Sequence, residues 1–283
     1  MTERVEANGI SISFNRRGSG PPLVLLHGAE ADHTMFDTFA PLLSDGFTVI
    51  AYDQRDSGGT TNPPVAYGFE ELADDAAALI AALGYKRAHI FGTSFGGVIA
   101  QVLASRHPEC VERLVLSSTF RAGAALPSIN SDFPRFAELR SRLPASAREF
   151  AEFFFTRDYL AAHPEASSIF TGNKRTDEQK ARRGAVIPRP ISVDFGRITA
   201  PTLVLAGAED RLIPPAHTLS LAHEIAKAQS VTIPDVGHVA TRQNPAAVAA
   251  AVKAFLQEHK TQQRQSPEED DHGRSGGGTR HAV

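Results

Sequence analysis

Short hydrophobic runs recur along this chain, and a polar or glycine-containing turn ends each of them. Most of these runs lack the alternation of polar and apolar positions that marks a half-exposed strand. Uninterrupted runs of this kind are typical of parallel strands that are buried on both faces of a sheet. The runs that we predict as strands cover residues 23–26, 47–52, 88–92, 112–118, 201–207 and 229–234.

Two further strand-like runs come before these and flank Asn8-Gly9. This dipeptide favours the tight turn of a β-hairpin, so we expect an antiparallel pair at one edge. Helical patterns lie between the other strands, most clearly at 69–83, 95–106 and 245–258. Strands that alternate with helices predict an α/β fold, with a mostly parallel eight-stranded sheet and helices on both faces.

More than 80 residues separate the strands at 112–118 and 201–207, and they contain helical but no strand-like patterns. This insertion is too long for a plain connection, so we interpret it as a helical cap over the carboxyl edge of the sheet. The polar, Gly/Ser-rich end of the chain is expected to be a disordered tail. The predicted division is a core of residues 1–120 and 198–258, a cap of 121–197 and a tail of 259–283.

Composition removes several classes of function. The chain has 283 residues, a net charge of −3 and no basic patch, which argues against a nucleic-acid partner. No apolar run approaches the roughly 20 residues of a membrane helix, and the polar start does not resemble a signal peptide. The single cysteine, Cys110, allows neither an internal disulfide nor a thiolate metal site, and we interpret it as a packing residue. We therefore expect a cytoplasmic protein.

The stretch Gly92-Thr93-Ser94-Phe95-Gly96 joins a predicted strand to a predicted helix. It matches the G-x-S-x-G nucleophile elbow, in which a sharp turn exposes the serine hydroxyl. The alternative is a glycine-rich turn that happens to contain serine. The position between a strand and a helix favours the elbow, and Ser94 is the candidate nucleophile.

A serine hydroxyl needs a base. His238 follows the last predicted strand, and Asp210 follows the strand before it. The chain order serine, aspartate, histidine is that of the α/β-hydrolase triad, in which the aspartate orients the imidazole. Glu209, directly beside Asp210, remains a competitor for that role.

An oxyanion formed during attack by Ser94 needs two backbone donors. The amide of Phe95 lies at a predicted helix N-terminus, directly after the serine. The second donor is expected in the loop after the strand at 23–26, and Ala29 is the best candidate. We interpret His27, two residues earlier, as a structural residue that closes the strand.

Five stretches carry a resemblance to the α/β-hydrolase superfamily over about residues 5–120 and 195–258. They are LLHGAEADHTMF, VIAYDQRDSGGT, FGTSFGGVIAQ, LVLAGAEDRLIPP and IPDVGHVATRQNP. The resemblance implies an eight-stranded sheet with a cap after the sixth strand, and no metal or organic cofactor. It also implies a triad of Ser94, Asp210 and His238, with an oxyanion hole from the amides of Ala29 and Phe95.

Two departures from the family pattern bear on the branch. Asp56 stands where the family's D-x-R-G-x-G turn usually has its first glycine, and Phe36 stands where many relatives have tryptophan. The turn Arg55-Asp56-Ser57-Gly58 is similar to that of the aclacinomycin methylesterase-like branch, and an enol-lactonase-like branch is also similar. Ser94 argues against haloalkane dehalogenases and epoxide hydrolases, which use an aspartate nucleophile.

Three functions remain open. The first is hydrolysis of a small carboxylic ester or lactone through an acyl-enzyme on Ser94. The second keeps the fold but changes the chemistry, to an enol-lactonase, a C–C bond hydrolase or a cofactor-free perhydrolase. The third is a ligand-binding signalling protein on a hydrolase scaffold.

Neither the oligomeric state nor the substrate can be derived from the sequence. In the cap, we expect most of Phe133, Phe136, Phe153, Phe154 and Phe155 to pack helices together rather than line a pocket. We likewise expect most cap arginines to lie on a solvated surface, although they leave an acidic substrate open. The arginines considered are Arg121, Arg135, Arg140, Arg142, Arg148, Arg157 and Arg175.

Overall fold

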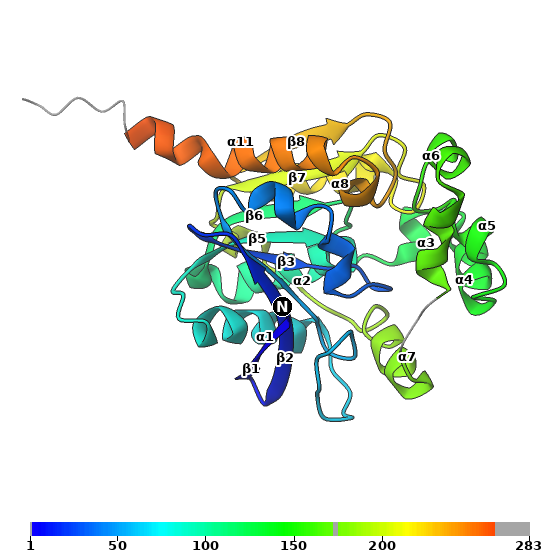
Figure 1. The fold of residues 1–283 in the computed structure, drawn as a ribbon, viewed down its shortest axis with the longest axis horizontal. Coiled ribbons are helices and arrows are strands. Elements are labelled where there is room, and N and C mark those ends of the chain that lie inside the picture. The colour runs from blue at the N-terminus through cyan, green and yellow to red at the C-terminus, as the bar shows by residue number, and fades with distance from the viewer. Residues whose placement is uncertain (1, 172–174, 264–283) are drawn as a thin grey trace, which may run out of the picture.

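All eight predicted strands pair into one sheet, with the order β1-β2-β4-β3-β5-β6-β7-β8 (Figure 1). The computed structural model describes residues 2–171 and 175–263. The strand bounds are β1 Thr2–Ala7, β2 Ile10–Arg17, β3 Pro22–Leu26, β4 Thr48–Tyr52, β5 Ala88–Thr93, β6 Val111–Ser117, β7 Thr202–Gly207 and β8 Ala228–Ile233.

The sheet is parallel from β4 to β8, and the hairpin adds the two antiparallel strands at its edge. Asn8 and Gly9 both have positive φ, 48° and 72°, which is the turn chemistry that a two-residue hairpin demands. Strands β4, β5 and β7 are buried at every position, as their continuous apolar runs predict. Strand β8 differs because it forms the other edge, and four of its six residues are exposed.

Helices cover both faces of the sheet. Helices α1 (Phe69–Ala82) and α2 (Phe95–Arg106) pack against each other on one face. The short 3₁₀ helix η2 (Ala40–Leu43) and the long helix α11 (Pro245–Gln263) pack together on the other. The remaining core elements are η1 His33–Phe36, η3 Pro108–Cys110, η5 Phe195–Arg197, α8 Pro215–Leu219, α9 Leu221–Glu224 and α10 Ala240–Gln243.

Helix α11 continues five residues beyond the predicted end of the last helix at 258, so the predicted tail does not begin at 259. The rest of that tail, residues 264–283, lies outside the described residues. Cys110 is buried in the hydrophobic core, as expected of a packing residue, and burial raises the pKa of its thiol to about 11. Phe36 is fully buried and meets Phe91 edge to ring.

The predicted cap is helical and lies at the carboxyl ends of the strands, at the right of Figure 1. It has two parts, which we call the aromatic half (residues 126–170) and the arginine half (residues 175–187). Figure 1 shows them apart, with α7 below the other cap helices. The cap elements are α3 Leu126–Ile129, α4 Phe133–Ser141, α5 Ala147–Ala151, α6 Arg157–Ala162, η4 Pro164–Phe170 and α7 Asp177–Gly184.

Helix α5 is shorter than its sequence pattern suggests, because the chain turns after Ala151. The following residues Phe153, Phe154 and Phe155 are all buried, which a continuous helix with one buried face cannot achieve. Across the described residues, every helix is too short or too polar to span a membrane.

Candidate active site

Ser94 lies at the junction of β5 and α2 in a strained backbone conformation, with φ 53° and ψ −122°. Few residues other than glycine adopt positive φ, and such strain gathers at functional sites. The glycines on either side allow this turn. A Cβ on Gly92 would clash with the carbonyl of Gly96, and one on Gly96 would clash with the backbone of Leu26. The predicted elbow conformation is confirmed.

Asp210 and His238 meet beneath the cap, although 28 residues separate them in the chain. His238 Nδ1 lies 2.9 Å from Asp210 Oδ2, and both side chains are at least 98% buried. The other carboxylate oxygen accepts hydrogen bonds from the amides of Leu212 and Ile213, each at 2.9 Å. These contacts fix the carboxylate against the imidazole. Glu209 is exposed, so Asp210 and not its neighbour contacts the histidine.

The outer nitrogen of His238, Nε2, is buried and has no hydrogen-bond partner among the described residues. His238 and Ser94 line the same cavity, but no hydrogen bond joins them in the part of the chain that the structure describes. The ring of Phe154, from the aromatic half, packs edge-on against the imidazole at 5.5 Å between centroids. A buried imidazole nitrogen left free toward a cavity is suited to accept a proton from a group that enters there.

The loop after β3 adjoins the elbow from the other side. A Cβ built on Gly28 would lie 3.7 Å from Cβ of Ser94. His27 is fully buried, and its Nδ1 lies 2.8 Å from the Gly28 carbonyl oxygen. The backbone amide of Gln54 donates to His27 Nε2 at 3.3 Å, so Nε2 is the acceptor. Nδ1 therefore carries the proton and donates to the Gly28 carbonyl oxygen. Burial, followed by the charge of Arg183, lowers the pKa of His27 to about 3.

His27 is therefore neutral at pH 7 and holds the loop that contains Ala29. This placement agrees with the structural role expected for His27. Ala29 and Phe95, the candidate oxyanion donors, both line the cavity beside Ser94.

Three arginines of the arginine half reach down into the core, which the sequence did not predict. Arg175 donates to the carbonyl oxygens of Asp56 and Ala31 at 2.7 and 2.8 Å. Arg182 forms a bidentate pair with the buried carboxylate of Asp56, at 2.7 and 2.9 Å. Arg183 is 3% exposed and binds the loop after β3.

The expectation of a solvated surface is therefore wrong for Arg175, and the sequence pattern carries no prediction for the contacts of Arg182 and Arg183 with the core. Asp56 is the residue from which these contacts could have been predicted. It stands at a position that is usually glycine, and its φ is 53°. A charged residue at a strained turn implies a partner, and the sequence Arg182-Arg183 offers one.

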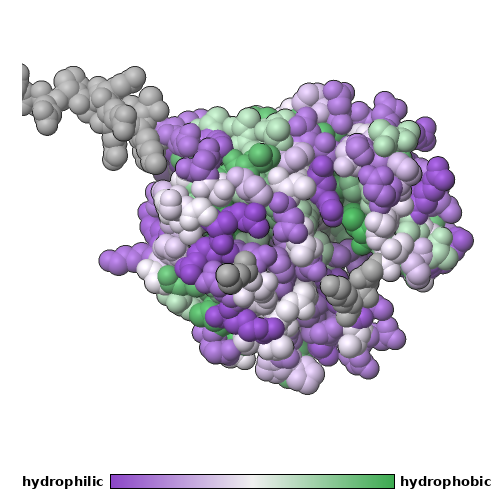
Figure 2. All heavy atoms as spheres, viewed as in Figure 1, coloured by the Kyte–Doolittle hydropathy of each residue, from purple (hydrophilic) through white to green (hydrophobic). Residues whose placement is uncertain are grey.

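The cavity above Ser94 has a volume of about 1060 Å³ and is lined by residues of both the core and the cap. Figure 2 shows hydrophobic side chains in the hollow where the core meets the cap, and further hydrophobic patches at the top and lower left of the same face. The expectation that most of the five cap phenylalanines pack away from a pocket is wrong, because Phe133, Phe136 and Phe154 line the cavity. Phe153 and Phe155 pack elsewhere, against Arg211 and Tyr159. The aromatic lining is completed by Phe95, Phe120 and Phe170.

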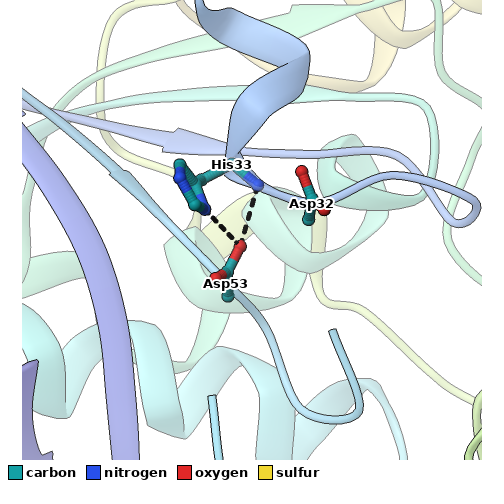
Figure 3. Close-up of side chains that lie close together, drawn as sticks. All are labelled: Asp32, His33 and Asp53. Atoms are coloured by element: carbon teal, nitrogen blue, oxygen red, sulfur yellow. Dashed lines mark hydrogen bonds and ion pairs between the residues drawn. The ribbon is translucent and has the colours of Figure 1, made fainter. Parts of the chain in front are cut away.

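A cluster of Asp32, His33 and Asp53 lies at the base of the loop after β3 (Figure 3). His33 donates to Asp53 Oδ1 from both its amide and Nδ1, each at 2.8 Å, and the Gly59 amide donates to Oδ2. The hydrogen bond to Asp53 raises the pKa of His33. A nitrogen that carries a proton cannot bind a metal, so we interpret this cluster as support for the turn at 53–59.

Comparisons with known proteins agree with this geometry. A model of the α/β hydrolase fold matches residues 21–245. The chain is 31% identical to 2-hydroxymuconate semialdehyde hydrolase of Pseudomonas sp. strain CF600, over 89% of this chain and 92% of that protein. It is 29% identical to rhodomycin D methylesterase of a Streptomyces species, over 82% and 90%.

Among solved structures, the chain is similar to the enol-lactonase from Burkholderia xenovorans LB400. The TM-score is 0.79, with 28% identity over 90% of this chain and 100% of that one. These similar proteins include a methylesterase and an enol-lactonase, and together they support membership of the α/β-hydrolase superfamily.

Proposed function

The chain belongs to the α/β-hydrolase fold family, and on that premise we propose that it hydrolyses a carboxylic ester or lactone through an acyl-enzyme on Ser94. The observation that carries the proposal is the buried Asp210–His238 pair. Its free Nε2 belongs to a histidine that shares a cavity with a serine in the elbow conformation. A purely structural ion pair has no need of such an arrangement.

In the proposed reaction, His238 Nε2 takes the proton of Ser94 Oγ while the oxygen attacks the carbonyl carbon. The carbonyl electron pair moves to the oxyanion, which the amides of Ala29 and Phe95 hold. Asp210 stabilises the imidazolium through Nδ1. His238 then returns its proton to the leaving alkoxide, and a water molecule, deprotonated by the same nitrogen, cleaves the acyl-enzyme. Substrate binding must bring Ser94 Oγ within hydrogen-bond reach of Nε2.

The cavity favours a substrate with a bulky, uncharged apolar group. Its volume of about 1060 Å³ exceeds what an acetyl ester fills, and phenylalanines supply much of the lining. Ion pairs within the protein already neutralise some of the arginines at or near the cavity. Arg140 pairs with Glu30 at 2.5 Å, and Arg182 pairs with Asp56.

A different reaction on the same machinery is the second candidate. The identity to a 2-hydroxymuconate semialdehyde hydrolase favours C–C bond or enol-lactone cleavage of a substrate that carries a carboxylate. Arg242 is one cavity-lining cation that would meet it, because it is half-buried and has no ion-pair partner among the described residues; Arg189, which also lines the cavity, is exposed. A perhydrolase would use the same Ser94, Asp210 and His238, and no feature of the structure favours it over the other two reactions. A ligand-binding signalling protein would not need a buried histidine whose Nε2 has no hydrogen-bond partner among the described residues, so this feature does not favour that alternative.

Labelling with a fluorophosphonate probe tests the proposal, with nitrophenyl esters of two to eight acyl carbons assayed in parallel. We expect rapid labelling of the wild type and none of Ser94→Ala, together with a loss of hydrolysis of at least about 10⁴-fold in that variant. Thermal melting shows whether both proteins are folded. Equal hydrolysis by the two proteins would refute the nucleophile. Turnover of a carboxylate-bearing dienone in preference to every neutral ester would favour the second candidate.

A further inference from the structure

Arg183 is a cation buried at the back of the candidate oxyanion hole. It comes from the last turn of α7 in the cap, yet its side chain ends among the core loops. Burial, followed by the charge of Arg175, lowers its pKa to about 10, so it stays charged at neutral pH. No carboxylate lies in ion-pair contact with it in the described part of the chain. Hydrogen bonds to uncharged oxygen atoms therefore replace the water that would otherwise solvate the guanidinium.

The guanidinium donates to four such oxygens. Two belong to the loop after β3: Nε lies 2.8 Å from the Ala29 carbonyl oxygen, and Nη2 lies 3.4 Å from that of Gly28. The other two belong to the turn after β4, where Gln54 Oε1 accepts at 2.6 Å and the Arg55 carbonyl at 3.3 Å. The planar fork thus ties the loop that holds Ala29 to a second, independently anchored loop.

The carbonyl oxygen of the peptide that joins Gly28 to Ala29 accepts from three groups. His27 Nδ1 donates at 2.8 Å, and Arg183 Nη2 and the backbone amide of Ala31 make longer contacts, each at 3.4 Å. Donors on a peptide oxygen draw electron density from its nitrogen and strengthen the N–H as a donor. The N–H of that same peptide is the amide of Ala29, which the proposed mechanism aims at the oxyanion.

Arg183 also covers the second donor residue. Its guanidinium carbon lies 4.5 Å from the ring centroid of Phe95, in a cation–π contact. The Phe95 ring is buried and packs against Phe69 of α1. One cap side chain is therefore in contact with both residues that are proposed to donate to the oxyanion.

We propose that Arg183 is a positioning residue that preorganises the oxyanion hole by fixing and polarising the Gly28–Ala29 peptide against Phe95. The inference rests on the proposed function, because it concerns the same oxyanion. Its consequence is that the arginine half of the cap takes part in catalysis.

The experiment compares Arg183→Met, Arg183→Lys and Lys180→Met with the wild type on one nitrophenyl ester. Methionine keeps much of the apolar stem and removes the charge and the fork. Lys180 is an exposed cation on the same helix, paired with Asp177, so its variant is the matched control. We expect Arg183→Met to lose about 30- to 100-fold in kcat with KM within threefold, and Arg183→Lys to lose less. Lys180→Met should match the wild type.

A second readout separates catalysis from cap attachment. A trifluoromethyl ketone forms a tetrahedral oxyanion on the serine, whereas the corresponding alcohol does not. In Arg183→Met, the affinity for the ketone should fall by about the same factor as kcat/KM, and the affinity for the alcohol should stay within threefold. A purely structural role would weaken both ligands equally, or change KM alone, and either result would overturn the proposal.

The remaining outcomes are also decisive. If the wild type shows no hydrolysis that depends on Ser94, the proposed function itself fails. If the wild type is active and Arg183→Met is folded with kcat within twofold, only the inference about Arg183 fails. If Arg183→Met does not fold, Arg183→Lys decides, because it keeps a buried cation but cannot bridge both loops. Wild-type kcat in that variant would refute the proposal.

Discussion

The two halves of the cap cover the same cavity but are attached to the molecule by different forces. In the aromatic half, Phe136 and Phe154 belong to a cluster of rings with centroids about 5 to 6 Å apart. In the arginine half, Arg175, Arg182 and Arg183 hold the core through directional hydrogen bonds to backbone oxygens, to one carboxylate and to the polar side chains of Gln54 and Ser57. Contact between rings tolerates sliding, whereas a guanidinium bound to fixed carbonyls does not.

This difference divides the work of the cap. The aromatic half supplies cavity wall, so it should decide which acyl or alcohol group fits. The arginine half supplies position, so it should decide how well the oxyanion is held. Glu30 connects the two, because its carboxylate contacts Arg140 of α4 at 2.5 Å and lies 3.8 Å from Arg175. The predictions that follow test whether the two halves separate in this way.

The largest effect is expected at the pair of Asp56 and Arg182. Arg182→Met leaves a carboxylate that is 2% exposed without its partner and should lower the free energy of unfolding by about 3 kcal/mol. Asp56→Gly removes the carboxylate and restores an unstrained residue at φ 53°, so it should cost less than about 1 kcal/mol. The double variant should recover most of the loss. Urea denaturation measures all three, and equal costs for the two single variants would contradict the pairing.

The second effect is a pH dependence of stability beneath the arginine half. The native pKa of His27 is about 3 and the ordinary value is 6.5. Between these values the unfolded chain binds a proton that the native state excludes. Stability should therefore be fully present above pH 6.5 and fall as the pH drops, by about 1.4 kcal/mol per pH unit. From pH 7 to pH 5 the fall is about 2 kcal/mol.

Denaturation curves of His27→Asn at these pH values check this dependence, since asparagine does not titrate and keeps a donor for the Gly28 carbonyl. The slope should flatten in this variant. His223→Asn, at an exposed position, serves as the control and should keep the wild-type slope. A wild-type slope in His27→Asn would show that other groups govern the acid side.

The smallest effect is expected in the aromatic half. Phe136→Leu removes part of the cavity wall and should lower kcat/KM for an octanoyl or aryl ester by about fivefold, about 1 kcal/mol. The acetyl ester, which does not reach this wall, should change less than twofold. Phe153→Leu is the matched control, because Phe153 is buried beside Phe136 but does not line the cavity. Phe153→Leu should lower stability and leave the ratio of kcat/KM for the two esters unchanged. A changed ratio in this control would contradict the assignment of substrate selection to the cavity wall.

Local sequence patterns predicted most of the core. The eight strands, the hairpin at Asn8-Gly9 and the elbow at Ser94 each depend on residues within a few positions of one another, so periodicity and turn chemistry reveal them. Asp210 and His238 could be identified as triad candidates from their order in the chain, because parallel strands end at the same edge of the sheet. The competition between Asp210 and Glu209 stayed open until the fold placed one carboxylate in the interior and the other in solvent.

The cap was different, because its contacts join segments far apart in the chain. Arg183 lies 154 residues from Ala29, and Arg182 lies 126 residues from Asp56. An arginine in a polar helix has the same sequence appearance whether it faces water or a buried carbonyl. The sequence by itself therefore determined the fold class, the elbow and the candidate triad through local periodicity and turn geometry. Only the tertiary structure decided which charges are buried, because burial depends on what the rest of the chain brings against them.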